Sequence, residues 1–431
     1  MICYLFGDGM YENHLICQSC GKKYELERMF EGCPSCKKGK FSSNIYVDYD
    51  YESIKEAIGK SILENRRGPG IFKYEELLPI DAKEGITTLG EGSTPLLPCT
   101  TLGELLDMDH LHVKDESRNP SHTFKDRSAA VAVSVARRFG SHHLIAGGGN
   151  TAAAASAYGA RYGFEVISFE NLEESKQAIL QTLSYGGKIV YLRQYEDRYP
   201  LMKTCVDTLG AHPVSSYTWS PTGDPYSEEG RKTIAYEICE QLQWKVPDKV
   251  IVPTGMGFGL SAVWRGFQDL YRIGLTESLP QMVAVESAAG GSLTRTIQKD
   301  SGTPERVELE ETIALHILVP QVGYQAYRAI IDSHGVAMTV EDPQIMEALF
   351  LLARNEGVYA STTSTSAIAA TKMLREQGDI DRNDCVVCVI TGGGLKDSQF
   401  VEPQFENLPP PIPGNWDTFI QLMKDHYDIG F

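Results

Sequence analysis

The sequence predicts an α/β protein in which helices cover parallel β-sheets and a small cysteine-rich module precedes them. From residue 111 onward, short apolar runs alternate with longer helical patterns, and this alternation is typical of parallel sheets. Glycine-rich turns join several of these runs directly to the helical stretch that follows. Two Cys-x-x-Cys pairs stand near the start of the chain. These features predict a cysteine module at residues 1–42 and a larger domain at 43–431.

Length, charge and hydropathy exclude several classes of protein. The 431 residues suggest two or three domains. A formal net charge of −17 argues against nucleic-acid binding, which needs a basic surface. No apolar run approaches the roughly 20 residues of a membrane helix. Residues 1–10 are mildly apolar but lack the basic flank and cleavage site of a signal peptide. We therefore expect a cytoplasmic protein without nucleic-acid or membrane partners.

The module carries its cysteines as two pairs, Cys17 with Cys20 and Cys33 with Cys36, and twelve residues separate the pairs. Each pair can form a tight knuckle that directs two thiolates to one point, and two knuckles give the four-sulfur site that zinc prefers. Since all four ligands would come from the protein, the zinc would be structural. Two disulfides or four unligated thiols are the alternatives, and a reducing cytoplasm disfavours disulfides.

The elements follow one another in a regular order along the rest of the chain. Residues 41–80 form a connecting segment with one predicted helix at 51–65, and the Gly-Pro-Gly turn at 68–70 ends it. Strands are predicted at 111–113, 144–146, 166–169, 188–191, 250–252, 282–285 and 386–390. Helices are predicted at 125–139, 151–162, 172–185, 229–242, 260–270, 342–356 and 365–377. The tail after residue 401 contains consecutive prolines and is predicted to be a surface extension.

Lys125 lies where a turn leads into a predicted helix, in the stretch 119–127. The positive end of a helix favours loss of the lysine proton, and an uncharged amine can form an imine with a carbonyl compound. From these residues alone, a capped helix with an exposed lysine is the alternative interpretation.

Two glycine-rich turns and one strand end carry the remaining candidate chemistry. Residues 147–151 (Gly-Gly-Gly-Asn-Thr) open a helix directly after a strand, where bare backbone amides either bind an anion or form an ordinary turn. Residues 253–259 (Pro-Thr-Gly-Met-Gly-Phe-Gly) suit a phosphate cradle. They do not match the nicotinamide fingerprint, because Leu260 stands where its last glycine is needed, and they lack the lysine of a Walker loop. Thr391 ends a strand, where its hydroxyl could meet a ring nitrogen.

With these motifs, the chain resembles the threonine synthase family of fold-type II (tryptophan synthase β) pyridoxal-phosphate enzymes over most of its length. The matching stretches are 72–79, 90–96, 114–116, 124–127, 149–153, 229–235 and 391–397. The resemblance implies two α/β subdomains with parallel sheets, the smaller one within residues 125–215. It also implies a small-molecule amino-acid substrate and is compatible with a homodimer.

The resemblance assigns a role to each residue of the candidate site. Lys125 is expected to bind pyridoxal phosphate covalently and to move protons at the substrate carbons. Asn150 is expected to hydrogen-bond the cofactor's ring oxygen, and Thr391 is expected to meet the pyridine nitrogen. The other cofactor contacts are expected from Phe124, Gly255, Met256, Gly257, Phe258 and Gly259. The substrate carboxylate is expected at Gly149, Thr151 and Ala152.

The chain departs from the family where relatives bind the phosphate of phosphohomoserine. Ser227 replaces the arginine of the family's Asn-Pro-x-Arg stretch, and residues 147 and 148 lack the expected hydroxyl. Either the substrate carries no phosphate, or residues such as Thr94, Lys114 or Arg231 bind it instead. We favour a changed substrate, because a dianionic phosphate without its arginine would be poorly compensated.

We therefore predict a pyridoxal-phosphate-dependent lyase or replacement enzyme that removes a group from the β- or γ-carbon of an amino acid. Threonine synthase is the nearest activity. A serine or threonine dehydratase and a cysteate-synthase-like β-replacement enzyme are the alternatives. A non-catalytic binding protein of this fold is disfavoured because Lys125 and the glycine-rich turn are intact. His122 is either an acid–base group of the substrate site or a turn residue that faces solvent.

Overall fold

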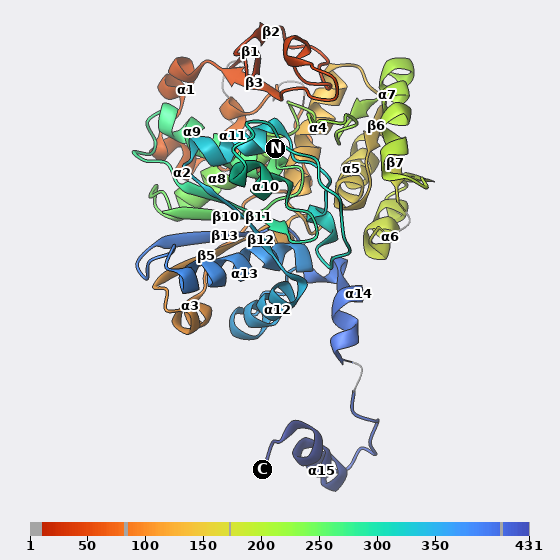
Figure 1. Ribbon diagram of the computed structural model, residues 1–431, viewed down its shortest axis with the longest axis vertical. Helices are drawn as coiled ribbons and strands as arrows, with labels where there is room; N and C mark the ends of the chain where they lie inside the picture. The colour runs from red at the N-terminus through yellow and green to blue at the C-terminus, as the bar shows by residue number, and fades with distance from the viewer. Residues whose placement is uncertain (1–10, 82–84, 172–173, 406–407, 431) are drawn as a thin grey trace.

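Three β-sheets organise the chain, whose computed structural model describes residues 11–81, 85–171, 174–405 and 408–430. They are a three-stranded sheet in the N-terminal module, a six-stranded sheet and a four-stranded sheet. Figure 1 shows the module at the top and the four-stranded sheet to the right of the six-stranded one. The prediction for residues 1–10 concerns a segment outside the described residues. In the described part of the chain, no helix has both the length and the apolar character needed to cross a membrane.

The N-terminal module is a small antiparallel sheet in the order β2-β1-β3. Its strands are β1 (Glu12–Cys17), β2 (Lys23–Tyr24) and β3 (Ile45–Tyr49). The first cysteine pair begins at the end of β1, and a 3-10 turn at Pro34–Cys36 carries the second pair. The fold thus brings both knuckles to one end of the module.

Asn44 fixes this module to the body of the protein. Its side-chain nitrogen donates to the carbonyl oxygens of Pro221 at 2.9 Å and Thr222 at 3.0 Å. Its side-chain oxygen accepts from the backbone N–H of Gln325 at 3.1 Å. The Thr222 hydroxyl donates back to the carbonyl oxygen of Phe30 at 2.9 Å. The module is therefore bonded to a loop that leads directly to the cavity described below.

The connecting segment contains two short helices, α1 (Tyr51–Ala57) and α2 (Lys60–Asn65), so the single helix predicted at 51–65 was wrong. Gly59 breaks the helix because its backbone is extended, with φ −149° and ψ 171°. The break lets the two helices turn separately toward the core, where Ile54 and Leu63 are both 0% exposed.

The six-stranded sheet forms the larger body of the protein. Its order is β12-β11-β10-β13-β5-β4, and its strands are parallel except for the edge pair β4–β5. The strands are β4 (Leu96–Pro98), β5 (His110–Asp115), β10 (Lys249–Pro253), β11 (Gln281–Ser287), β12 (Val336–Val340) and β13 (Cys385–Ile390). The central strands β10 and β13 are buried almost throughout, which explains their continuous apolar sequences.

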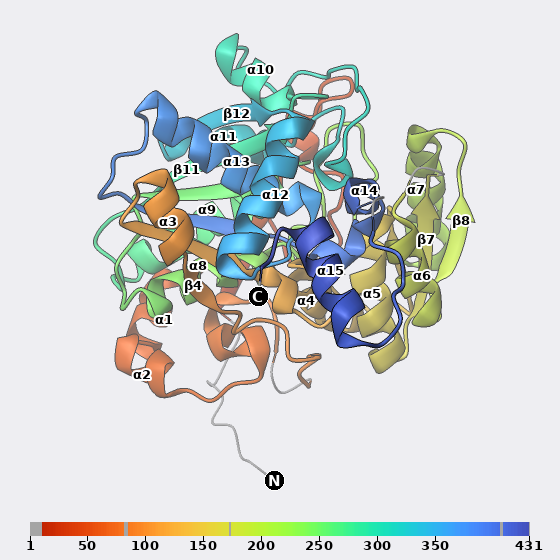
Figure 2. The same cartoon turned by 90° about the horizontal axis from the view of Figure 1, so that it is seen from below.

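Helices cover both faces of this sheet, as predicted. They are α3 (Thr100–Leu106), α8 (Glu229–Gln241), α9 (Phe258–Arg272), α10 (Ser292–Gln298), α11 (Tyr324–Asp332), α12 (Asp342–Glu356) and α13 (Thr362–Gln377). Alternate strand residues point to opposite faces. Val250 and Val252 share a core cluster with residues of α8, α9 and α11, whereas Ile251 packs with residues of α3, α12 and α13. Figure 2 shows α3 and α12 on the face seen from below.

The four-stranded sheet is wholly parallel, in the order β8-β7-β6-β9. Its strands are β6 (His143–Ala146), β7 (Glu165–Glu170), β8 (Lys188–Tyr191) and β9 (His212–Pro213). Its helices are α4 (Lys125–Arg138), α5 (Gly149–Tyr162), α6 (Lys176–Ser184) and α7 (Arg198–Leu209). Val131 of α4 packs in the same core cluster as Ile234 of α8, so α4 joins the two larger sheets.

All seven predicted strands are present, but the sequence analysis missed several shorter elements, among them α3, α7, α10, α11, β4, β9 and β12. Pro200 lies in the first turn of α7, where its missing N–H breaks no helical bond. The residues of β12 are mostly half-buried, so they lack a clear alternation. The tail contains α14 (Ser398–Val401) and α15 (Trp416–Tyr427), and Figure 1 shows α15 standing away from both sheets.

Candidate active site

A cavity lies between the two larger sheets, at the carboxyl ends of β6, β10 and β13, where parallel α/β sheets bind their ligands. Its wall consists of residues 123–125, 147–151, 214–216, 253–260, 315–319 and 391–392 with Asn171, Glu174, Arg198, Arg231, Ser361 and Thr363. The lysine turn, both glycine-rich turns and Thr391, which are far apart in sequence, therefore meet in one place.

Lys125 is the first residue of α4 and lines the cavity. The end of β13 fixes the backbone before it: the Phe124 N–H donates to the Thr391 carbonyl oxygen at 3.0 Å, and the Thr123 hydroxyl donates to it at 3.1 Å. Burial, followed by the positive charge of Arg231, lowers the pKa of Lys125 to about 7. The amine is therefore largely uncharged just above neutral pH, as a nucleophile requires.

This pKa predicts how the rate at which Lys125 reacts with an aldehyde changes with pH. Only the uncharged amine attacks an aldehyde, so the rate of reaction with pyridoxal phosphate should rise about tenfold per pH unit below pH 7. The rate should level off above pH 7, because Lys125 is then deprotonated. Stopped-flow absorbance, with N-acetyl-lysine methylamide as the control amine, measures this. The rate of the control amine should keep rising to about pH 10. The same behaviour of the protein would contradict the lowered pKa of Lys125.

Asn150 and Gly149 open α5 at the cavity. The side-chain oxygen of Asn150 is buried and has no hydrogen-bond partner among the described residues, so this amide is available to a ligand. The Gly149 N–H already donates to the Glu170 carboxylate at 3.0 Å, and a side chain at Gly149 would meet the Glu174 carboxylate at 3.0 Å. The helix start predicted to hold the substrate carboxylate is thus already flanked by two carboxyl groups of the protein.

The glycine-rich turn after β10 has no room for side chains at its glycines. At Gly257, where φ is +86°, a Cβ would lie 2.2 Å from the Cβ of Ala326, and at Gly259 it would lie 2.7 Å from the Phe124 ring. The turn leads into α9, so its backbone N–H groups lie at the positive end of a helix. Bare amides at a helix start form a binding site for phosphate.

Thr391 places its hydroxyl in the cavity wall at the end of β13. That hydroxyl lies 3.1 Å from the hydroxyl of Ser364, whose oxygen also accepts from the Gly392 N–H at 2.8 Å. These bonds fix the Thr391 side chain. The cavity therefore offers a ring nitrogen an uncharged hydroxyl at this point.

Four predicted substrate contacts lie outside the cavity wall: Thr94, His122, Ala152 and Ser227. The Thr94 hydroxyl donates to Glu116 at 2.6 Å, within a buried network of charges. His122 is exposed in a turn with φ +62°, Ala152 is buried inside α5, and Ser227 is buried in the turn before α8. The geometry of the cavity does not support their predicted contacts.

Several polar residues of the wall escaped the sequence analysis, among them Arg198, Ser215 and His316. Arg198 donates to the Gly147 carbonyl oxygen at 2.8 Å, and the Ser215 hydroxyl accepts from the Gly147 N–H at 3.0 Å. Ser215 therefore supplies a hydroxyl beside the glycine where the family resemblance led us to expect one. No motif surrounds these residues, and only the packing of separate elements brings them to the cavity.

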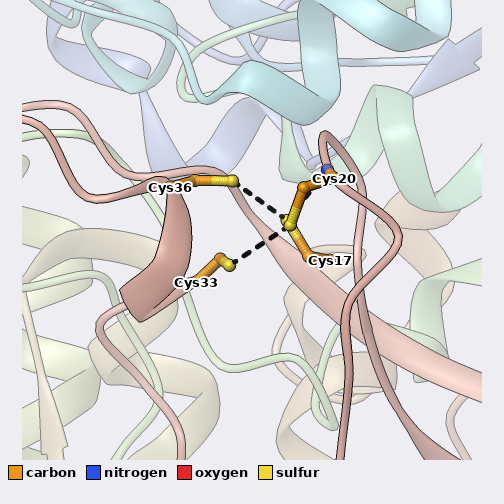
Figure 3. A group of neighbouring side chains, drawn as sticks. All are labelled: Cys17, Cys20, Cys33 and Cys36. Carbon is orange, nitrogen blue, oxygen red and sulfur yellow. Dashed lines mark hydrogen bonds between the residues drawn. The ribbon is translucent and has the colours of Figure 1, made fainter.

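The four cysteines of the N-terminal module form a candidate metal centre. All four Sγ atoms lie within 4.8 Å of one another, and Figure 3 shows the side chains of Cys17, Cys20, Cys33 and Cys36 directed at one point. The Sγ atoms of Cys17 and Cys36 are 3.7 Å apart, and those of Cys20 and Cys33 are 3.8 Å apart. A tetrahedral ion held at about 2.3 Å by sulfur requires edges of about 3.8 Å. The Tyr24 hydroxyl, 3.0 Å from the Cys33 Sγ, adds a polar neighbour.

Comparison with known proteins agrees with the geometry of the cavity. Residues 87–392 match the family described as pyridoxal-phosphate dependent enzyme. The residues present fit that cofactor, because Lys125 offers an amine for its aldehyde, the turn after β10 offers amides for its phosphate, and the Asn150 side-chain amide lines the cavity with its oxygen unpaired among the described residues. The fold and the cavity define a pyridoxal-phosphate-dependent enzyme.

Curated relatives narrow this class. The chain is 36% identical to the threonine synthase of Methanocaldococcus jannaschii, across 88% of this chain and 92% of that protein. It is 34% identical to the threonine synthase of Methanosarcina acetivorans, across 94% of this chain and 97% of that protein. The chain therefore belongs to the threonine synthase family and is a pyridoxal-phosphate-dependent lyase of that type. The resemblance inferred from its motifs is confirmed.

Solved structures share the fold. An L-serine ammonia-lyase from Rhizomucor miehei superposes with a TM-score of 0.63 at 20% identity, over 73% of this chain and 98% of that chain. Threonine deaminase isoform 2 from Solanum lycopersicum gives a TM-score of 0.60 at 20% identity, over 73% and 88% of the two chains. At this identity the likeness concerns the fold alone, and it confirms the predicted fold class.

Proposed function

We propose that this lyase holds pyridoxal phosphate through Lys125 and removes a group from the β- or γ-carbon of an amino acid. The observation that carries the proposal is the position of Lys125, an amine of lowered pKa in one cavity with the glycine turn and Thr391. The bound cofactor supplies an electron sink, which lets a proton leave the α-carbon of an amino acid. The Lys125 amine would accept that proton and deliver it to a neighbouring carbon.

Other residues of the wall would hold the cofactor in place. The Asn150 side chain would bond the ring oxygen, the backbone N–H groups of residues 255–259 would bind the phosphate, and Phe124 would flank the ring. The Thr391 hydroxyl would meet the ring nitrogen. Because a hydroxyl carries no charge, that nitrogen would stay less positive than beside a carboxylate, and elimination or replacement would be favoured over transamination.

Two substrate classes fit this chemistry. The relatives named threonine synthase support the formation of threonine from a phosphorylated amino acid. Ser227, which replaces an arginine of the family's motif, supports a changed substrate without phosphate. A serine or threonine dehydratase or a cysteate-synthase-like β-replacement would then be the activity.

An absorbance titration of the cofactor-loaded enzyme tests this proposal. Phosphohomoserine, phosphoserine, threonine and serine form the panel, and the spectrum, released phosphate and released ammonia are the readouts. Phosphate and threonine formed from phosphohomoserine alone would identify a threonine synthase. Ammonia from serine or threonine would identify a dehydratase. If none of the four changed the spectrum, the proposed reaction class would be wrong.

We also propose that Cys17, Cys20, Cys33 and Cys36 bind one structural zinc ion. The sulfur–sulfur distances of 3.7 and 3.8 Å support a tetrahedral site. With four protein ligands the site would be closed, so the metal would stabilise the module rather than take part in the reaction. A zinc–thiolate centre suits a reducing compartment, which supports the proposal of a cytoplasmic enzyme.

Removal of the metal should weaken the active site as well as the module. We expect one zinc per chain by elemental analysis and none in Cys33→Ser with Cys36→Ser. Because Asn44 bonds the module to the loop at residues 221–222, we also expect that variant to have a raised KM. Cys205→Ser, which changes a half-buried thiol of α7, should keep both its zinc and its KM. A protein purified without zinc and unaffected by the double substitution would refute the metal site.

A further inference from the structure

Arg231 is a buried guanidinium that forms no ion pair with a carboxylate of the described residues. It lies in the first turn of α8, lines the cavity and is only 3% exposed. One of its terminal nitrogens donates to the Ser128 hydroxyl at 2.8 Å, whereas its Nε has no hydrogen-bond partner among the described residues. A buried charge that lacks a counter-ion is strongly unfavourable. The position of Arg231 therefore calls for an anionic ligand.

Neighbouring buried cations are paired within the protein, which sets Arg231 apart. Lys232, the next residue along α8, bonds Asp269 at 2.6 Å, and Arg265 bonds Glu229 at 2.6 Å. The interior around α8 thus contains carboxylates for its other cations. The guanidinium of Arg231 faces the cavity instead.

Glu228, three residues before Arg231, does not neutralise it. One Glu228 oxygen accepts from the side-chain nitrogen of Gln325 at 3.0 Å, and the other has no partner among the described residues. Burial raises the pKa of Glu228 to about 8, against the opposing charges of Arg231 and Arg265. Glu228 therefore forms no ion pair with Arg231, and the charge of Arg231 remains available to a ligand.

Arg231 and Lys125 both lie near the Phe124 ring, and the charge of Arg231 acts on Lys125. Its guanidinium carbon is 5.5 Å from the centroid of the Phe124 ring, and the Lys125 Nζ is 4.8 Å from the same centroid. The phosphate of the cofactor already has a binding site in the bare amides of residues 255–259. A second anion near Lys125 would therefore belong to the substrate.

We propose that Arg231 binds an oxyanion on the side chain of the substrate, such as a phosphate, sulfonate or carboxylate. The inference rests on the proposed function and names the substrate class of that site. Ser227, where the family's motif has its arginine, lies in the turn before α8, four residues before Arg231. The Arg231 N–H donates to the Glu228 carbonyl oxygen at 3.0 Å, so the turn before α8 is already wound. In this chain the guanidinium group is therefore that of Arg231, about one turn after the position of the arginine in the family's motif.

Spectral titration of the cofactor-loaded enzyme with matched pairs of amino acids tests this inference. Phosphohomoserine is compared with homoserine, and phosphoserine with serine, for wild type, Arg231→Gln and Arg231→Lys. Arg382→Gln is the control, because it removes one positive charge from an exposed arginine at the opposite end of β13. The affinity for pyridoxal phosphate is measured in parallel for each protein.

Arg231→Gln should weaken binding of the phosphorylated members by about 10- to 100-fold and change binding of the neutral members by less than about threefold. Arg231→Lys should lie in between, and Arg382→Gln should match wild type. Equal losses for both members of a pair, or a wild type without preference for the phosphorylated members, would overturn the inference. A loss of cofactor affinity in Arg231→Gln would also overturn it and assign Arg231 to the cofactor phosphate. Failure of the proposed function can be distinguished from failure of this inference. In that case the wild-type enzyme itself would lack an absorbance band that depends on Lys125.

Discussion

Lys125→Ala is expected to lose the visible absorbance band of the lysine-bound cofactor and to lower kcat by at least about 10³-fold. The residue would both bind the cofactor covalently and transfer protons, and positioned proton transfer alone is worth about 10²- to 10⁴-fold. No other lysine lines the cavity in the described part of the chain. Absorbance spectra and steady-state kinetics, with circular dichroism to confirm folding, measure the effect.

Lys396 offers a matched control for this substitution. It is also buried, burial lowers its pKa to about 8, and its Nζ donates to Gln181 at 2.5 Å. It does not line the cavity. Lys396→Met should therefore keep the absorbance band, and borohydride reduction followed by peptide mapping should label Lys125 alone. A label on Lys396, or a band that survives in Lys125→Ala, would show that the reacting lysine has been misassigned.

Arg127→Ala is expected to lower the free energy of unfolding by about 3–5 kcal/mol, because it leaves the buried Glu116 carboxylate without an ion-pair partner and Glu237 with Lys114 alone. Arg127 is 0% exposed and bonds both oxygens of Glu116 at 2.7 Å. It also bonds the two oxygens of Glu237 at 2.7 and 2.8 Å, and Lys114 bonds Glu237 at 2.7 Å. The network joins α4, α8 and β5 directly behind the active site, so its loss should affect folding more than chemistry. Urea denaturation followed by fluorescence measures the change.

Arg382→Ala provides the contrast. Its pair with Asp109 spans 3.0 Å but is largely exposed, with side-chain exposures of 59% and 43%. An exposed ion pair is worth less than about 1 kcal/mol, so this variant should unfold close to the wild-type midpoint. If both variants unfolded at similar urea concentrations, burial would not be the reason why the Arg127 network stabilises the protein.

Short-range patterns were sufficient to predict most of the secondary structure. The continuous apolar run at 386–390 corresponds to β13, which is buried on both faces. The helix predicted at 342–356 matches α12, where a capping box and a following Gly357 mark its two ends locally. Helix α7 was missed, although Pro200 in its first turn is compatible with a helix start. The break at Gly59 was missed because it depends on how Ile54 and Leu63 reach the core.

The candidate site likewise contains residues that local sequence patterns predicted and residues whose contacts they did not predict. Lys125, the glycine turn and Thr391 were predictable because each lies in a local motif whose backbone chemistry is readable from sequence. The predicted contacts of Thr94 and Ser227 found no support in the cavity, because their partners are distant in sequence. The Thr94 hydroxyl bonds Glu116, and the Ser227 N–H donates to Asp224 at 3.2 Å.

The sequence by itself determined the fold class, the family, the lysine that lines the cavity and the cysteine cluster. These depend on periodicity, on motifs a few residues long and on the spacing of identical ligands, which are all local properties of the chain. Only the tertiary structure decided which charges are compensated. It places carboxylates against Arg127 and Lys232 but leaves Arg231 facing the cavity. Whether a buried charge has a counter-ion depends on elements from different parts of the chain, and this pairing decides which side chains remain available for a substrate.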